Sequence, residues 1–528
     1  MLFKALVLTG FVVSAGGVAF GLAVLWPLRA RIPPSMPRRS LALIAAGAGA
    51  VLVFEVALLL VEPWALADEL GRWPVAEFLA TGFAHAGLAH AAVAAAVAIV
   101  ALRGRARPTS GSTWALLAAG AVLLAASGAL LVHGASRLEG AAALATTTVV
   151  HQVGAAIWAG GLVHLLAQRL LRRADPSAGP AWTEVVSRFS PVAASGVGVI
   201  ALTGAFLAWR YVGSVRGLVG TAYGAMVLTK VLLMGAALFL GGRNFLGARS
   251  WRSRGESTPV ERLRVASHVE AEAGAVLVIV LVAAALTSQP PAVDSVVKAT
   301  IRDAAEMFAP KRPRLVPPPY HEMVATAAAS LDPWATPGPL DRDQSDFNHN
   351  VAGILVLVTA LGALLDRVGR VRAARHWPLT FLALAAFLVV IGEPNGWPFG
   401  PEGFFETLLS PAVFMHRVAT ALVVAFAVLE WRVRVGKLAA TRWRFVLPLM
   451  AVVGGALLLT HSHSPLATRW LYVIELSHNA IGLLAVLIGV ARWLELRSPD
   501  PGERRAWGIV WPTFMALIGL VLAFYREP

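Results

Sequence analysis

The feature that most constrains this chain is a series of long apolar segments that recurs along the whole sequence. About 20 apolar residues are enough to cross ~30 Å of hydrocarbon as an α-helix. Fourteen such segments can be marked. The composition agrees, with 57% hydrophobic residues, 14% charged residues and a mean hydropathy of +0.68. The chain is therefore predicted to be an all-α, polytopic membrane protein of about 14 transmembrane helices.

The segments fall into two groups, separated by a long polar interruption. Eight segments precede it: Leu2 to Leu28, Leu41 to Val61, Val75 to Leu102, Trp114 to Val132, Ala143 to Leu166, Phe189 to Trp209, Thr221 to Leu240 and Val269 to Thr287. Six follow it: Val351 to Leu365, Trp377 to Ile391, Pro411 to Trp431, Phe445 to Thr460, Leu471 to Trp493 and Trp507 to Phe524. Three regions are predicted: an eight-helix bundle (1–288), a proline-rich linker (289–347) and a six-helix bundle (348–528).

Clusters of Arg and Lys follow every odd-numbered segment and predict the orientation of the chain. These clusters lie at 29–39, 103–107, 169–188, 243–264, 367–375, 432–444 and 492–505. Short basic loops stay in the cytoplasm, so both termini and the linker are predicted to lie outside, in the periplasm of a bacterial inner membrane. The net charge of +15 is then a topological signal, and no nucleic-acid partner is expected. Within the linker, Val297, Ile301, Ala304, Ala305 and Phe308 recur at helical spacing and predict a short surface helix.

With this topology, ten of the thirteen histidines are predicted to lie at or near the outer face. Five of them occupy the outer part of inward-running helices: His85, His151, His349, His416 and His478. The other five are His90, His133, His321, His461 and His463. Imidazole is the commonest protein ligand for copper, zinc and haem iron, so this layer predicts a metal or haem site. The chain has no cysteine, and Cu(I), Cu(II) and haem b all remain compatible with the ligands.

Each candidate ligand also has a structural interpretation. The pair His461 and His463 can bind one metal ion or be two solvated side chains. Glu475 can support His478 as a carboxylate partner one helical turn away, or the two can make ordinary interhelical hydrogen bonds. Two residues beside His416 complete the set, because Met415 is a possible sulfur ligand and Arg417 can bind a haem propionate, snorkel or pair with Glu406.

Two ionisable residues lie inside predicted helices, where an unpaired charge costs several kcal/mol. Lys230 is in the seventh segment and Glu55 in the second. They can pair with each other or line a path for protons or ions. The motifs of hydrolases, P-loop ATPases and dinucleotide-binding enzymes are absent from the sequence. A transporter or metal-delivery protein is therefore favoured over an enzyme.

The fifth to eighth segments, about residues 143–287, resemble the copper resistance D (CopD) membrane domain. The most specific part of the resemblance runs from His151 to Leu162, with the form H-x6-W-x-G-G. It continues at Thr203-Gly204, Tyr223-Gly224, Lys230 and Arg243-Asn244. The resemblance implies a copper-handling inner-membrane protein that acts with a periplasmic copper-binding partner. It also implies His151 and Trp158 as site residues, with Lys230 as a weaker candidate.

Spacing adds a further expectation to this motif. His151 and Trp158 are seven residues apart and are expected to share a helix face, and Gly160-Gly161 is expected to permit close helix packing. A similar local pattern, H-N-x-x-G, occurs at His349 and at His478, with a glycine one turn after each imidazole.

Two alternatives to copper transport are compatible with the same residues. A b-type membrane cytochrome would hold haem between His85 and His151, or between His478 and either His349 or His416. A copper-delivery protein would instead pass the metal to a partner at the outer face.

Overall fold

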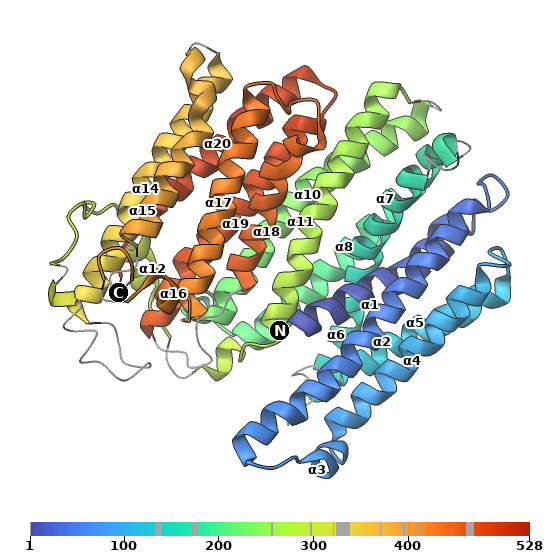
Figure 1. The fold of residues 1–528 in the computed structure, drawn as a ribbon. Helices are drawn as coiled ribbons and strands as arrows, with labels where there is room; N and C mark the ends of the chain where they lie inside the picture. Colours follow the sequence, from blue (N-terminus) through green and yellow to red (C-terminus); the bar gives the residue numbers. More distant parts are fainter. Residues whose placement is uncertain are drawn as a thin grey trace. The chain divides into compact units, whose positions relative to one another are not determined.

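The computed structural model of the 528-residue protein is entirely helical over its described part (Figure 1). The structure describes residues 2–131, 140–171, 175, 178–254, 257–295, 298–319, 321–323, 338–369, 371–392, 396–400, 402–409, 411–460 and 469–527. Within these ranges, thirteen helices are long and apolar enough to cross a membrane. The predicted segment 411–431 forms helix α17 (Pro411–Arg434), which is not among the thirteen. The prediction of an all-α, polytopic membrane protein is confirmed, and its helices imply a lipid bilayer around them.

The chain forms two compact units. Unit 1 comprises Met1–Leu218 and Met226–Asp294, and unit 2 comprises Val219–Ala225 and Ser295–Pro528. The finer division into eight-helix and six-helix membrane bundles stays a prediction, as does the placement of both termini outside.

Unit 1 is built from long helices joined by short turns. Its elements are α1 (Leu2–Phe20), η1 (Gly21–Leu25), α2 (Ser35–Leu70), α3 (Val75–Leu79), α4 (Gly82–Gly104), α5 (Gly111–Ala129), α6 (Ala141–Ala155), η3 (Ala156–Gly160), α7 (Gly161–Leu171), α8 (Ala178–Val212), α9 (Val215–Val219), most of α10 (Ala222–Arg254), α11 (Pro259–Leu286) and η4 (Ala292–Asp294). Helices α1, α2, α4 and α5 pack side by side around Leu41, Ile44 and Trp114 (Figure 1).

Helices α6, η3 and α7 form one continuous rod, and its central turn is π-helical. This turn packs directly on α1, because a Cβ atom at Gly160 would lie only 2.0 Å from the Val12 carbonyl oxygen. The expected close packing at Gly160 is therefore present. The same turn makes the expected shared face of His151 and Trp158 wrong: His151 contacts α8, whereas Trp158 contacts α11. A π-turn adds a residue, and each residue rotates later side chains by about 100°.

Unit 2 contains the remaining helices. These are α12 (Ile301–Phe308), α14 (Pro339–Val368), η5 (Arg372–Leu379), α15 (Thr380–Val390), α16 (Phe404–Thr407), α17, η6 (Arg442–Phe445), α18 (Val446–Thr460), α19 (Arg469–Arg497) and α20 (Pro501–Ala523). The short helix predicted in the linker is present as α12, and Thr300 and Asp303 cap its first turn.

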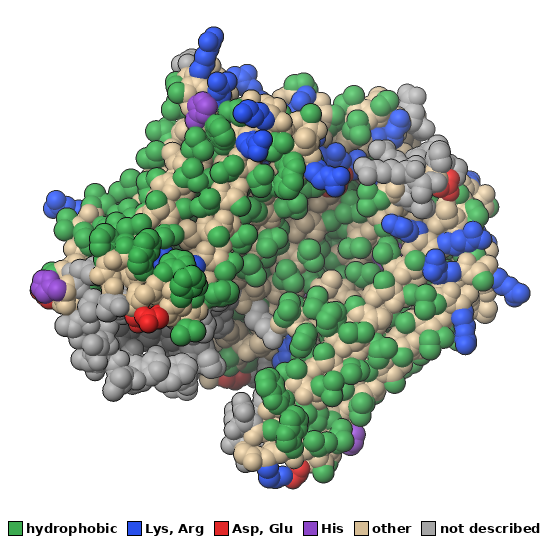
Figure 2. Space-filling view, viewed as in Figure 1, with side chains coloured by type: hydrophobic (Ala, Val, Ile, Leu, Met, Phe, Trp, Pro, Cys, Tyr) green, Lys and Arg blue, Asp and Glu red, His purple; other side chains and the backbone are tan. Residues whose placement is uncertain are grey.

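The core of unit 2 lies between α14, α19 and α20, with Trp377 and Trp511 at its centre. The glycines of the two H-N-x-x-G patterns lie at helix contacts, as expected. A Cβ atom at Gly353 would be 2.2 Å from the Ala523 nitrogen, and one at Gly482 would be 3.0 Å from the Gly455 carbonyl oxygen. Hydrophobic side chains are spread along the visible helix surface, as a lipid-facing surface requires (Figure 2).

Candidate functional site

In unit 1, His151 is held by a hydroxyl group on the neighbouring helix α8. Its Nδ1 atom lies 2.9 Å from Thr203 Oγ1. The Thr203 hydroxyl donates its hydrogen to the Val199 carbonyl oxygen at 2.5 Å, so it accepts from Nδ1. This network assigns the hydrogen to Nδ1 and leaves the lone pair on Nε2, the form of imidazole that binds a metal. Gly204 makes room for the ring, since a Cβ atom there would be 3.2 Å from His151 Cε1.

Lys230, on α10, lies close enough to His151 for its charge to act on the imidazole. Over the described chain, no carboxylate forms an ion pair with Lys230. The alternative pairing with Glu55 is therefore wrong. Glu55 is buried on α2 beside Gly87, and its charged neighbour is Lys4 of α1.

Trp158 leads to a residue that the sequence analysis missed. The Trp158 indole Nε1 donates a hydrogen bond of 2.9 Å to Glu272 Oε1, and Asn244 Nδ2 donates one of 3.0 Å to Glu272 Oε2. All three side chains are buried, with Glu272 only 4% exposed. The available signal was an acidic residue inside an apolar segment, because such residues in membrane helices are costly and usually functional.

In unit 2, two of the predicted histidines meet. The rings of His349 on α14 and His478 on α19 are 6.4 Å apart between centroids, at an interplanar angle of 87°. His349 Nδ1 donates to the Ser345 carbonyl oxygen at 2.8 Å, and His478 Nδ1 donates to the Ile474 carbonyl oxygen at 2.8 Å. Because a carbonyl oxygen can only accept, both rings carry hydrogen on Nδ1 and the lone pair on Nε2.

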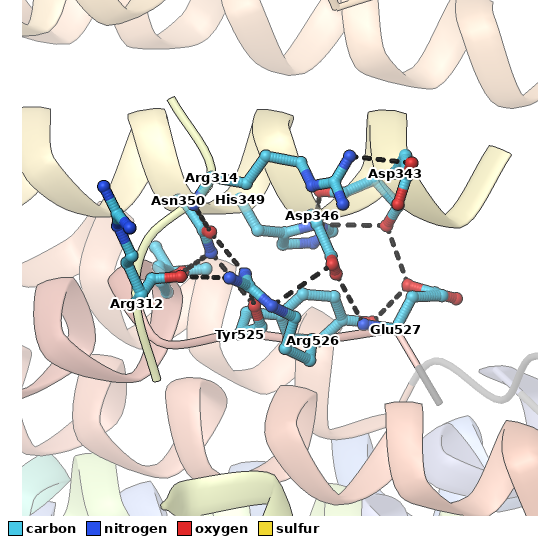
Figure 3. Close-up of polar contacts among 11 residues, drawn as sticks. Arg312, Arg314, Asp343, Asp346, His349, Asn350, Tyr525, Arg526 and Glu527 are labelled. Carbon is cyan, nitrogen blue, oxygen red and sulfur yellow. Dashed lines mark hydrogen bonds and ion pairs between the residues drawn. The ribbon is translucent and has the colours of Figure 1, made fainter. Parts of the chain in front are cut away.

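The segment after α20 packs against His349 (Figure 3). The Tyr525 ring stacks on His349 with 4.1 Å between centroids, and its hydroxyl donates to Glu527 Oε2 at 2.6 Å. Burial and the Glu527 carboxylate raise the pKa of the Tyr525 phenol above its usual value, so it stays a donor. Arg526 donates to Asn350 Oδ1 at 2.6 Å, which fixes the segment to α14. The imidazole of His349 is therefore held by the Ser345 carbonyl oxygen through Nδ1 and by the Tyr525 ring through stacking.

Four further candidates lie on α17 and α19. His416 is exposed, and its charge acts on His349, so it lies near the pair. Arg417 donates to the Val389 carbonyl oxygen at 2.7 Å, whereas Glu406 caps α16, so the proposed pairing of these two is wrong. Glu475 is partly buried on α19. Met415 lies on α17, and its side chain is outside the described part.

The remaining histidines divide into exposed and enclosed ones. His85 on α4 and His321 in the linker are exposed. His90 contacts Ser127 Oγ at 2.9 Å, the same histidine-to-hydroxyl arrangement as in His151. Both ring nitrogens of His164 are engaged, by Ser40 and the Val13 carbonyl oxygen. The predicted ligands His461 and His463, together with His133, lie outside the described residues.

The predicted layer of histidines does not form a single site among the described residues. No group of three or more His, Cys, Asp or Glu side chains there is placed to hold a metal ion. The arrangement instead provides single imidazoles and one pair, and the Nδ1 hydrogen is assigned in His151, His349 and His478. Imidazole is a suitable ligand for Cu, Zn, Fe and Ni ions, but a stable site at such positions would need further ligands.

A second polar cluster in unit 2 contains Asp366, Arg367, Glu430, Arg434, Arg492 and Glu495. Arg492 binds Glu495 at 2.6 Å, and Arg367 contacts the same carboxylate. The Trp511 indole donates to Glu495 at 2.7 Å. These groups neutralise one another, so the network is suited to joining α14, α17, α19 and α20.

The fold is that of a polytopic helical membrane protein, and it places several imidazole side chains inside its helices. The sequence profile of the family "Copper resistance protein D" (CopD) matches residues 183–286. Residues 183–286, called here the CopD-family segment, are similar to this family, and the predicted resemblance is confirmed. The "Copper transport protein CutJ" of Bacillus subtilis (strain 168) is 33% identical over 141 residues, which is 27% of this chain and 24% of CutJ. The chain therefore matches about a quarter of that relative's length. No solved structure matches.

The matched segment contains Thr203, Lys230, Asn244 and Glu272 but begins after His151 and Trp158. Both of these residues nevertheless bond to it, His151 through Thr203 and Trp158 through Glu272. The CopD-family segment thus provides the partners that orient the two motif residues.

Proposed function

We propose that this protein handles copper in a bacterial inner membrane, either moving it across the bilayer or delivering it at the outer face. The observation that best supports this proposal is the contact between His151 and Thr203, a residue of the CopD-family segment. Because Thr203 accepts the Nδ1 hydrogen, Nε2 of His151 is the nitrogen available to a metal. CutJ, the matched relative, is described as a copper transport protein, which supports the same cargo. The protein acts as a transporter or delivery protein rather than an enzyme.

In this proposal, His151 is the copper ligand of unit 1, and His349 with His478 forms the copper ligand pair of unit 2. His416, exposed near that pair, is a third ligand for copper in transit. His85, His461 and His463 stay candidates on the strength of their predicted depth alone. No thiolate is available in a chain without cysteine, so imidazole is the main ligand for copper in either oxidation state.

The orientation follows from the basic loops, with both termini and the linker in the periplasm. The ligands would then lie in the outer half of the membrane, within reach of a periplasmic copper-binding protein. Such a partner would hand copper to the outer histidines, so that the metal need not cross the interface as a hydrated ion.

Copper binding by the purified full-length protein tests this proposal. The wild-type protein and the variants His151→Ala, His349→Ala and His478→Ala are equilibrated with Cu(I) or Cu(II), and bound copper is measured by mass spectrometry. We expect each variant to bind less copper than the wild type. His321→Ala is the matched control, because that side chain is 85% exposed and should leave copper content unchanged. Equal copper content in all five proteins would overturn the proposal.

The visible absorption spectrum of the same preparations tests the haem alternative. The facing rings of His349 and His478 favour this second candidate, since histidines on facing helices are the ligands of a b-type haem. A Soret band at stoichiometric yield that disappears in His478→Ala would replace copper handling in unit 2 by electron transfer. Absence of the band together with bound copper would support the copper proposal.

A further inference from the structure

Glu272 is a buried carboxyl group with neutral hydrogen-bond partners. It lies halfway along the 28-residue helix α11 and is 4% exposed. Its two oxygen atoms accept from the Trp158 indole and the Asn244 amide, both of which are uncharged. A Cβ atom at Gly241 would lie 2.9 Å from Oε1, so this glycine gives the carboxyl group the space it occupies.

The charged groups on the surrounding helices are engaged elsewhere. On α11, Glu270 pairs with Arg169 of α7, and His268 lies one turn earlier. On α10, Arg243 is exposed. None of these groups forms an ion pair with Glu272 in the part of the chain that the structure describes.

The other elements against α11 bring no cation to this carboxyl group either. The π-turn η3 contains no charged residue, and the charged residue of α1 is Lys4, beside Glu55. His164 of α7 is bound to Ser40 and the Val13 carbonyl oxygen. Lys230 of α10 lies beside His151. An ionised Glu272 would therefore be a buried charge without a counter-charge, which costs several kcal/mol in hydrocarbon.

We propose that Glu272 is a proton-binding site, at which Oε2 takes up a proton from water and later returns it. In the protonated form Oε1 is the carbonyl oxygen and accepts from Trp158, which can only donate. No electron is transferred: an O–H bond of a hydronium ion breaks as the Oε2–H bond forms, which leaves water, and the reverse occurs when the proton is returned.

Asn244 allows both protonation states to be satisfied. When Glu272 is ionised, Asn244 Nδ2 donates to Oε2, the arrangement seen at 3.0 Å. When Glu272 is protonated, Oε2–H donates to Asn244 Oδ1 after the amide has turned over, at a similar heavy-atom distance. Asn244 Oδ1 is buried and has no hydrogen-bond partner among the described residues. The amide can therefore turn without breaking another hydrogen bond there.

The site offers a way to exchange a proton for cargo in unit 1, because Glu272 lies in the CopD-family segment that also holds Thr203. This use of the proton rests on the proposed copper function, whereas the proton site itself does not. The two parts can therefore be tested separately.

Infrared spectroscopy of the full-length protein in lipid, titrated with pH, tests the proton site. We expect the carbonyl stretching band of a protonated carboxylic acid at neutral pH, with an isotope shift in D2O, and its loss in Glu272→Gln. Trp158→Phe and Asn244→Leu should move the band to higher frequency, because each removes a hydrogen bond to the acid. Glu270→Gln is the matched control, since that carboxylate is ion-paired, and it should leave the band in place.

Two results would overturn the proton site. The first is an identical carbonyl region in the wild type and Glu272→Gln, which would mean an ionised group. The second is no acid band together with less bound copper in Glu272→Gln, which would make Glu272 a metal ligand. The isotope shift is read on the wild-type protein alone, so it holds even where a variant fails to fold.

Proteoliposomes containing a pH-sensitive dye test the coupling. Copper addition should move protons with the wild type but not with Glu272→Gln. If the acid band is present but the protein takes up no copper, the proton site is supported and the proposed copper function is wrong. Copper uptake with unchanged proton movement in Glu272→Gln would overturn the coupling.

Discussion

In unit 2 the buried charges are tied to one another, whereas in unit 1 Glu55 and Glu272 stand without an ion-pair partner among the described residues. Glu430, Arg492 and Glu495 are each less than 5% exposed, and each is bound by an opposite charge. In unit 1, the corresponding exception is the pair of Arg169 and Glu270. A paired network stabilises a fixed arrangement of helices, while an isolated ionisable group is costly and is retained for what it binds. The comparison therefore places the unpaired buried carboxyl groups of the described chain, the candidates for binding a proton or an ion, in unit 1.

The candidate histidines also have fewer partners in unit 1 than in unit 2. His151 is a single imidazole with one hydroxyl partner, beside a lysine. His349 and His478 form a pair, and Tyr525 covers one ring. Unit 2 thus presents two half-buried imidazoles side by side, and unit 1 a single half-buried imidazole at His151.

The largest effect is expected from Glu495→Gln in unit 2. The substitution removes the charge that binds Arg492 at 2.6 Å and contacts Arg367, so that Arg492 keeps only the longer contact of 3.5 Å with Glu430; breaking a buried ion pair costs about 3–5 kcal/mol. The midpoint of thermal unfolding in detergent should fall sharply. Glu55→Gln removes a buried carboxyl group of unit 1 that lies near Lys4 but forms no ion pair among the described residues, so it should leave the midpoint unchanged or raise it. Equal destabilisation by both variants would break the comparison between the units.

The next effect concerns whether the histidines act together. His349→Ala and His478→Ala share a site in the proposal, so the loss of copper affinity in the double variant should be smaller than the sum of the single losses. His151→Ala combined with either should be additive, which equilibrium dialysis with copper can measure. Coupling between His151 and His478 would contradict the assignment of separate ligands to the two units.

A smaller effect is expected from Thr203→Val. Without the hydroxyl, His151 Nδ1 loses its partner, and loss of such a partner typically lowers metal affinity by about 10–100-fold. Copper affinity is again the measurement. Thr148→Val on α6 is the control, because that hydroxyl donates to the Leu144 carbonyl oxygen of its own helix. Unchanged affinity in Thr203→Val would mean that Thr203 does not orient a copper ligand.

The smallest effect is expected from Tyr525→Phe, which keeps the ring on His349 and removes the hydrogen bond to Glu527, at a cost of about 1 kcal/mol. The pKa of Tyr525 is raised in the folded protein, so its contribution is fully present below the unfolded pKa of about 10 and is lost as pH rises towards the folded pKa. The wild type should therefore lose stability in alkaline solution more steeply than Tyr525→Phe. Parallel pH profiles of the unfolding midpoint would count against this role.

Much of the fold was predictable because apolar runs of membrane length leave a helix as the expected structure. The linker helix α12 was also visible, since its spacing is local. The shared face of His151 and Trp158 was wrong because the π-turn Ala156–Gly160 depends on close packing against α1, which no local spacing reveals. Glu272 was missed because its partners are 114 and 28 residues away in sequence.

The sequence by itself determined the helices, their apolar surfaces and the resemblance of the CopD-family segment, because each follows from neighbouring residues or from a continuous motif. Only the tertiary structure decided which of the predicted histidines meet, which nitrogen each offers, and that Glu272 lies beside Trp158 and Asn244. These properties depend on the rotation of each helix about its own axis. That rotation is decided by packing between helices, through contacts such as those of Gly16, Gly160 and Gly353.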